Sequence, residues 1–202
     1  MKALILVDIQ NDFLPGGALA VPNGDEVVPV ANRLMPEYEL VVATQDWHPP
    51  DHGSFASQHP EHSVGAVITV DGIDQVLWPD HCVQGTPGAE FAPVLNTEAI
   101  DHAIRKGTDR LVDSYSGFFD NDHRKATGLG DYLKQQRVTT VDVMGLATDY
   151  CVKFTALDAV ELGFEVRLLI EGVRGVELMP GDCDAAIGQM KNAGVQVVEN
   201  HI

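Results

Sequence analysis

Short apolar runs alternate with amphipathic segments along the chain, most clearly in its last third. In order, that third is predicted to form a strand at 141–146, a helix at 149–162, a strand at 164–170, a helix at 183–192 and a strand at 195–198. Gly163 and Gly194 directly follow the two predicted helices, where glycine commonly ends a helix. Alternation of this kind predicts a mainly parallel sheet with helices on both faces.

The first two thirds carry shorter elements. Continuous apolar runs at 3–7 and 40–43 are typical of strands buried on both faces, and an amphipathic helix is expected between them at 27–34. A short strand is expected just before Lys106, followed by a helix at 129–135. The order of elements therefore predicts an α/β protein.

Reactive side chains stand where several of these apolar runs end. Asp8, Asp46, Lys106 and Cys151 each follow such a run. Ligands of parallel sheets bind beyond the carboxyl ends of the strands, so we expect the four side chains to converge on one edge. The Pro-, Gly- and His-rich segment at about 46–93 starts at the same edge. A loop of that length in a compact domain predicts that it builds a site.

Composition narrows the class of protein. A chain of 202 residues without internal repeats predicts one domain over 1–202. The net charge of −17 argues against nucleic-acid and anionic-membrane partners, because phosphates would be repelled. Cys82, Cys151 and Cys183 form no CxxC pair, and the chain shows neither a secretory leader nor a membrane-spanning apolar stretch. We therefore expect a cytoplasmic protein.

Cys151 lies at a predicted strand-to-helix turn, in the stretch GLATDYCVKFTA. Thr148 or Asp149 would cap the helix and leave the thiol in its first turn. The helix dipole and a nearby cation would both lower the pKa of such a thiol, and free backbone N–H groups there can bind an oxyanion. The alternative is a small buried apolar side chain without chemistry.

Asp8 and Lys106 each admit two interpretations. A buried carboxylate at a strand end either accepts hydrogen bonds from the following turn or transfers protons. A lysine at a strand end is either solvated or paired with buried acids. If both meet Cys151, the ammonium offsets the negative charges and Asp8 takes the thiol proton, which makes a coherent Cys/Asp/Lys triad.

Asp46 and His48 are two apart in an extended segment, so both side chains can reach one metal ion. The candidates for a third ligand are His52, His59, His62 and His81. Imidazole with carboxylate suits Zn²⁺, Fe²⁺ or Mn²⁺. The alternative is that these histidines are polar loop residues.

Three aromatic residues, Phe13, Trp47 and Trp78, lie in loops near these groups. Aromatic residues in structured loops commonly anchor a minor core. Flat apolar rings beside a few polar groups would equally suit a small planar substrate.

Several blocks together resemble the nicotinamidase family, which belongs to the cysteine-hydrolase superfamily with isochorismatases and N-carbamoylsarcosine amidases. These blocks are VDIQNDF, QDWHPPDHGSFASQH, WPDHCVQGTPGAEF, RKG, DSYSGFFDN and MGLATDYCVKFTALDA. They span nearly the whole chain in the family's order. The resemblance implies a three-layer Rossmann-like sandwich with one mostly parallel six-stranded sheet.

Carried over residue by residue, the resemblance makes Cys151 the nucleophile, Asp8 the general base and acid, and Lys106 the cation that orders them. It implies an oxyanion hole from the backbone N–H groups of Ala147 and Cys151, with a cis peptide before Ala147. The implied substrate-binding residues are Phe13, Trp78, Ala147 and Tyr150. Tyr150 departs from some relatives, which have histidine there.

The resemblance also implies one divalent metal ion, most simply Zn²⁺ with Fe²⁺ or Mn²⁺ as alternatives, held by Asp46, His48 and His81. His52 and Ser54 lie where some members add a ligand or a water-mediated contact. The implied reaction converts nicotinamide to nicotinate and ammonia through a thioester, in NAD salvage, and pyrazinamide is a further expected substrate.

Two alternatives to that function stay open. One is an amidase of the same superfamily acting on a carbamoyl or aliphatic amide. The other is a non-enzymatic metal or thiol sensor on the same fold. The number of subunits stays open too, with a homo-oligomer as one alternative.

Overall fold

The apolar runs of the chain form one parallel sheet in the computed structural model, which describes residues 1–199. Its strands are β1 (Lys2–Val7), β2 (Leu40–Asp46), β5 (His102–Lys106), β6 (Thr140–Leu146), β7 (Glu165–Arg174) and β8 (Gln196–Val198). Within the described residues this sheet has six strands in the order β5-β2-β1-β6-β7-β8, and every neighbouring pair is parallel. The predicted α/β fold class is confirmed. Residues 200–202 of the predicted domain range lie outside the described part.

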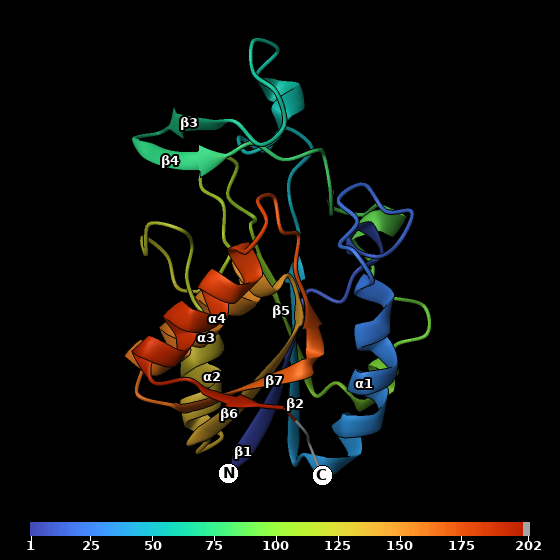
Figure 1. Cartoon of the computed structure of the whole chain (residues 1–202), viewed down its shortest axis with the longest axis vertical. Coiled ribbons are helices and arrows are strands. Elements are labelled where there is room, and N and C mark those ends of the chain that lie inside the picture. Colours follow the sequence, from blue (N-terminus) through green and yellow to red (C-terminus); the bar gives the residue numbers. More distant parts are fainter. Residues whose placement is uncertain (200–202) are drawn as a thin grey trace.

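Helices cover both faces of the sheet (Figure 1). They are α1 (Val27–Leu34), α2 (Leu129–Gln135), α3 (Lys153–Glu161) and α4 (Asp182–Ala193). Helix α1 lies on one face, and α2, α3 and α4 lie on the other (Figure 1). The buried residues of α1 recur at helical spacing and join the main apolar core; they are Val27, Val28, Ala31 and Leu34. No helix in residues 1–199 is long and apolar enough to span a membrane.

A hairpin interrupts the segment that the sequence predicted to be irregular. Strands β3 (Val67–Val70) and β4 (Ile73–Val76) pair antiparallel, and they lie far from the N-terminus, beyond the carboxyl ends of the main strands (Figure 1). Asp71 and Gly72 both have positive φ, at 50° and 79°, as in the tight turns that join such strands. The Asp-Gly pair was the available signal for this hairpin.

The turn that carries the cysteine also differs from the prediction. Instead of a helix that starts at Asp149, a π-helical turn spans Thr148–Val152, and α3 follows from Lys153. Ala147 occupies the N-cap position, and no side chain caps the turn, so the predicted capping by Thr148 or Asp149 is wrong.

Later boundaries are closer to the prediction. Strand β7 continues to Arg174, four residues beyond the predicted end at 170, after its register with β6 shifts between Val143 and Gly145. Gly163 and Gly194 lie at the ends of α3 and α4, as predicted, and both take left-handed conformations, with φ of 87° and 105°. The four strands β5, β2, β1 and β6 are consecutive neighbours, so whatever follows them converges at one edge.

Candidate active site

Three of the predicted residues meet at the carboxyl edge of the sheet. Asp8 follows β1, Lys106 ends β5, and Cys151 lies in the turn after β6. Lys106 Nζ lies 2.9 Å from Asp8 Oδ2 and 3.4 Å from Cys151 Sγ. All three side chains are buried. A carboxylate, an ammonium and a thiol therefore share one pocket, although they are far apart in the sequence.

The Lys106 ammonium is the centre of this cluster. It also donates to Asp46 Oδ1 at 2.5 Å and to the Ser114 carbonyl at 2.8 Å. Burial by itself lowers the pKa of Lys106, but the charges of Asp46 and Asp8 outweigh it and raise the pKa well above its usual value. The lysine is therefore a fixed cation at neutral pH.

Asp8 is held in a strained but well-supported conformation. Its φ of 48° lies in the left-handed region, which is unfavourable for a residue with a Cβ. Thr44 Oγ1 donates to Asp8 Oδ1 at 2.6 Å and accepts from the Asp8 amide at 3.2 Å. Burial raises the pKa of Asp8 to about 6, because Lys106 offsets only part of the desolvation. The carboxyl can therefore gain and lose a proton near neutral pH. No pattern in the sequence indicated the role of Thr44.

The Cys151 thiol does not have the lowered pKa that its position suggested. Burial raises the pKa well above its usual value, Lys106 offsets part of this, and the carboxylates of Asp8 and Asp46 raise it again. The resting sulfur therefore keeps its proton. Because Asp8 lies beside it with a pKa near 6, the nearest base is already in place.

The turn around Cys151 contains the candidate backbone donors for an oxyanion. The Leu146–Ala147 peptide is cis, as the resemblance implied. The Ala147 carbonyl accepts from the amides of Tyr150 and Val152, both at 3.1 Å. The first amides of a helical turn lack partners within the helix. Ala147 and Cys151 both line the pocket, so their N–H groups are the candidates for holding an oxyanion.

A second buried cluster lies beside the first. Asp46 Oδ2 lies 3.5 Å from His48 Nε2 and 3.8 Å from His81 Nε2. The Nδ1 atoms of the two rings lie 2.8 Å from the Gly107 carbonyl and 2.7 Å from the Pro79 carbonyl. A carbonyl oxygen only accepts hydrogen bonds, so each Nδ1 carries a proton. The hydrogen bond fixes the orientation of each ring, with Nε2 facing Asp46.

These residues fit a divalent metal ion. Nε2 of His48 is buried and has no hydrogen-bond partner among the described residues. Two carboxylates, Asp8 and Asp46, share one ammonium, so a further cation would balance the buried charge. Two imidazoles and a carboxylate are a donor set that Zn²⁺ and similar ions accept.

The pKa shifts of Asp46 and His81 favour the protonation states that a metal ligand needs. Burial raises the pKa of Asp46, but the charges of Lys106 and His48 outweigh it, and the net shift is strongly downward. Burial and the neighbouring His48 lower the pKa of His81 to about 4, so this ring is neutral and can bind a metal. Gly107 has φ of 63°, and a Cβ there would lie 2.4 Å from the His48 ring, so only glycine allows this approach.

Of the other candidate histidines, only His52 lies near this cluster. His52 is buried next to this cluster, and its Nδ1 lies 2.7 Å from Ser54 Oγ. Its ligating atoms, with those of His48 and Asp113, form an overlapping buried group. His59 Nε2 lies 2.9 Å from a loop carbonyl, and His62 is exposed beside an acid. Neither of these two joins the site.

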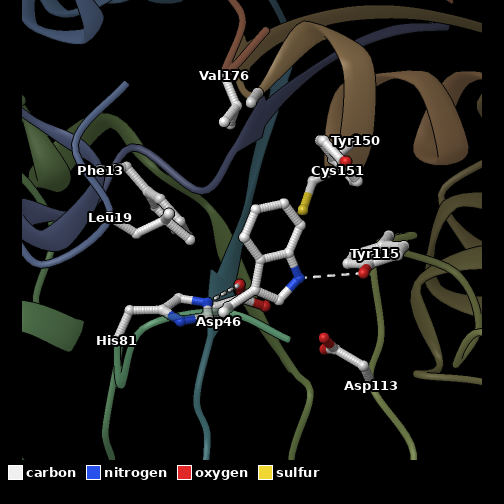
Figure 2. Close-up of a pocket in the computed structure, with 11 residues that line it drawn as sticks. Phe13, Leu19, Asp46, His81, Asp113, Tyr115, Tyr150, Cys151 and Val176 are labelled. Atoms are coloured by element: carbon white, nitrogen blue, oxygen red, sulfur yellow. Dashed lines mark hydrogen bonds and ion pairs between the residues drawn. The ribbon is translucent and has the colours of Figure 1, made fainter. Parts of the chain in front are cut away.

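Aromatic and aliphatic side chains wall a pocket beside the Cys151 sulfur (Figure 2). Its predicted members are Phe13, Trp78, Ala147 and Tyr150, and its further members include Leu19, Asp113, Tyr115 and Val176. Trp78 Nε1 donates to Tyr115 Oη at 3.1 Å. Asp113 and Tyr115 belong to the block DSYSGFFDN, so a signal existed for them. No sequence motif indicated that Leu19 and Val176 would line the pocket.

Comparison with known proteins gives a family match and similar proteins that cover nearly the whole chain. A family model described as the isochorismatase domain matches residues 2–201. The nicotinamidase of Escherichia coli is 52% identical over 96% of this chain and 92% of its own length. The structure of the Acinetobacter baumanii nicotinamidase pyrazinamidease has a TM-score of 0.95 and 45% identity, covering 98% of this chain and 95% of that one. The pyrazinamidase of Pyrococcus horikoshii in complex with zinc has a TM-score of 0.81 and 40% identity, covering 98% and 99%.

Proposed function

This chain belongs to the isochorismatase family, and from that premise we propose that it hydrolyses nicotinamide to nicotinate and ammonia. The observation that carries the proposal is the shared contact of Lys106 Nζ with Asp8, at 2.9 Å, and with Cys151, at 3.4 Å. The high identity to a nicotinamidase supports the choice of substrate. Pyrazinamide, a flat ring amide of similar size, is proposed as a second substrate.

The first half of the proposed reaction forms a tetrahedral intermediate on Cys151. The ring lies between Phe13 and Trp78, with the amide carbon over Cys151. Asp8 removes the thiol proton, the sulfur forms a bond to the amide carbon, and the backbone N–H groups of Ala147 and Cys151 hold the oxyanion. Each such donor contributes roughly 3–4 kcal/mol in comparable sites.

The second half releases both products. Asp8 returns its proton to the amide nitrogen as the C–N bond breaks, so ammonia leaves as a neutral molecule. The same carboxylate then takes a proton from water as the water oxygen bonds to the thioester carbon. The C–S bond breaks, Asp8 gives that proton to the sulfur, and the acid product ionises to nicotinate. Lys106 keeps one positive charge beside Asp8 and Cys151 throughout, which limits the cost of each negative charge that forms.

We propose that Asp46, His48 and His81 hold one Zn²⁺, with Fe²⁺ or Mn²⁺ as alternatives. When bound, the ion would supply a positive charge that orients and polarises the substrate. The zinc-containing pyrazinamidase to which the chain is similar supports this choice. His52, held by Ser54, is proposed to support the site, as a further ligand or from outside it.

Ammonia release tests this function. Purified protein is incubated with nicotinamide, with an aliphatic amide and with a carbamoyl compound, and ammonia is measured in each. We expect release from nicotinamide at least a hundredfold faster than from the other two. Faster release from the carbamoyl or aliphatic compound would favour the alternative amidase, and no release from any would favour a sensor.

The remaining sequence predictions join this proposal. The charge of −17 supports a small-molecule substrate rather than nucleic acid or a membrane surface. The three free cysteines support a reducing cytoplasm and a role in NAD salvage there. A single domain over 1–202 and assembly into a homo-oligomer are predictions for hydrodynamic measurement.

A further inference from the structure

A buried carboxylate in the nucleophile turn lies outside the proposed chemistry. Asp149 is two residues before Cys151 and only 4% exposed. Its Oδ1 accepts from the Val176 amide at 3.0 Å, and its Oδ2 accepts from the Glu177 amide at 2.7 Å. Both oxygens thus bind backbone donors of the segment between β7 and α4. Hydrogen bonds from amides to a charged acceptor are among the stronger ones in proteins.

That segment supplies part of the pocket wall. The Val176 side chain lines the pocket near Cys151 (Figure 2). Asp149 lines a separate groove outside that pocket. The residues that follow turn outward, with Leu178 44% and Met179 67% exposed. Little packing therefore holds the outer side of this segment, and the hydrogen bonds to Asp149 hold the inner side.

The close approach of the segment to the turn is specific. A Cβ on Gly175 would lie 2.0 Å from Cys183 Sγ and 3.1 Å from Asp149 Oδ1. Glu177 takes a left-handed conformation, with φ of 53°, while its amide bonds to Asp149. The backbone of this segment is thus fitted to the Asp149 carboxylate.

We propose that Asp149 is a positioning residue that fixes Val176 as the upper limit on the size of the substrate ring. The inference rests on the proposed hydrolysis of a ring amide by Cys151. Asp149 itself touches no reacting atom. It joins the turn that carries the nucleophile to the wall that confines the substrate, so the two keep a constant separation.

Kinetics of Asp149→Asn test this inference, because the amide keeps the shape of the side chain but loses one of two acceptors. We expect KM for nicotinamide to rise about tenfold, the effect of one charge-assisted hydrogen bond, with kcat changed less than threefold. Discrimination against a larger fused-ring amide, quinoline-3-carboxamide, should fall by a similar factor. A merely structural role would lower stability without changing this ratio.

The matched control is Asp182→Asn. Asp182 Oδ2 accepts from the Met179 amide at 2.9 Å, so this variant removes one charge beside the same segment, while its amide oxygen can still accept that bond. We expect its KM to change less than twofold. An equal effect of the two variants would mean that charge or general loosening is responsible, and would overturn the proposal.

A double variant tests the route through Val176. Val176→Ala truncates the wall with Asp149 intact, and should reproduce the rise in KM and the loss of ring discrimination even if Asp149→Asn folds poorly. Adding Asp149→Asn should then change KM less than twofold. Full additivity, or unchanged KM in both single variants, would contradict the inference.

Hydrogen exchange separates this inference from the proposed function. The Val176 and Glu177 amides should both exchange slowly in the wild type, and at least one of them should exchange at least tenfold faster in Asp149→Asn, whether or not nicotinamide is a substrate. Equal exchange would refute the positioning role. A wild type that releases no ammonia from nicotinamide would instead refute the proposed function.

Discussion

Two neighbouring halves of the site share one lysine, but the pKa values of their carboxylates shift in opposite directions. The thiol half comprises Asp8, Lys106 and Cys151, and the imidazole half comprises Asp46, His48 and His81. Burial raises the pKa of Asp8 to about 6, whereas Lys106 and His48 overcome burial and lower the pKa of Asp46 far below its usual value. One carboxyl is thus suited to exchange protons, and the other is a permanent anion that attracts a cation.

The difference follows from what surrounds each carboxylate. Asp8 has one cation close by, at 2.9 Å, and a hydroxyl donor from Thr44. Asp46 has the same cation at 2.5 Å and two imidazoles within 4 Å. Lys106 offsets only part of the burial of Asp8, whereas Lys106 and His48 together favour the charged form of Asp46 by more than burial disfavours it. Proton transfer and cation binding can therefore proceed side by side without competing.

Removing the proton acceptor should have the largest effect on the thiol half. In Asp8→Asn the amide keeps the shape of the carboxyl but cannot take the Cys151 proton. We expect kcat to fall about 10³-fold, within the range for loss of a general base. Metal content, measured by elemental analysis, should stay at the wild-type ratio. A loss of kcat smaller than threefold would contradict the assignment of Asp8 as the acceptor of the Cys151 proton.

Disrupting the imidazole half should mainly weaken substrate binding. Removing the metal with a chelator, or replacing His48 by alanine, should raise KM for nicotinamide roughly 10–100-fold, as changes at metal sites commonly do. Re-added Zn²⁺ should restore the stripped wild type but not His48→Ala. His62→Ala, in the same loop region but exposed, is the matched control and should keep its KM. An unchanged KM for nicotinamide after metal removal would mean that the imidazole half has no role in substrate binding.

The pH dependence should report the thiol half. Asp8, with a pKa of about 6, must be ionised to accept the thiol proton, so kcat/KM should fall as the pH drops below about 6, by about tenfold per pH unit. The groups that face Asp8 are Lys106, Thr44, Cys151 and Asp46. None is expected to titrate between pH 5 and 7, because the pKa values of Lys106 and Cys151 lie higher and that of Asp46 lower. A flat profile down to pH 4.5 would contradict this assignment.

The smallest expected effect comes from the support of Asp8. Thr44→Val removes the hydroxyl that donates to Asp8 Oδ1. We expect kcat/KM to fall about fivefold, the effect of one hydrogen bond, and the acidic limb of the profile to move to higher pH. Because the hydroxyl favours the ionised form, a limb that moved to lower pH would contradict this explanation.

The sequence could predict what depends on strand ends. Apolar runs located the strands of the parallel sheet, and the rule for ligand sites then brought Asp8, Asp46, Lys106 and Cys151 to one edge. Choosing His81 over His52 required the family resemblance, because the backbone path between about 46 and 93 is not periodic. The hairpin within that segment was missed despite its Asp-Gly turn.

Features that depend on three-dimensional balance could not be predicted. Position at a helix start suggested a lowered thiol pKa for Cys151, but burial and two carboxylates outweigh the lysine. Thr44 and Val176 reach the site from a strand interior and from a connecting segment, where no local pattern distinguishes them. Asp149 resembled a helix cap in sequence and instead binds amides 27 and 28 residues further on.

The most direct test of the central claim compares ammonia release and substrate binding in Cys151→Ala. If the Cys151 sulfur is the attacking atom, this variant should release no ammonia above background while nicotinamide binds with a Kd within about threefold of that of the slowly reacting Asp8→Asn protein. Ammonia release at the wild-type rate would mean that the thiol is not the nucleophile, and the arrangement of Asp8 and Lys106 around it would then need another explanation.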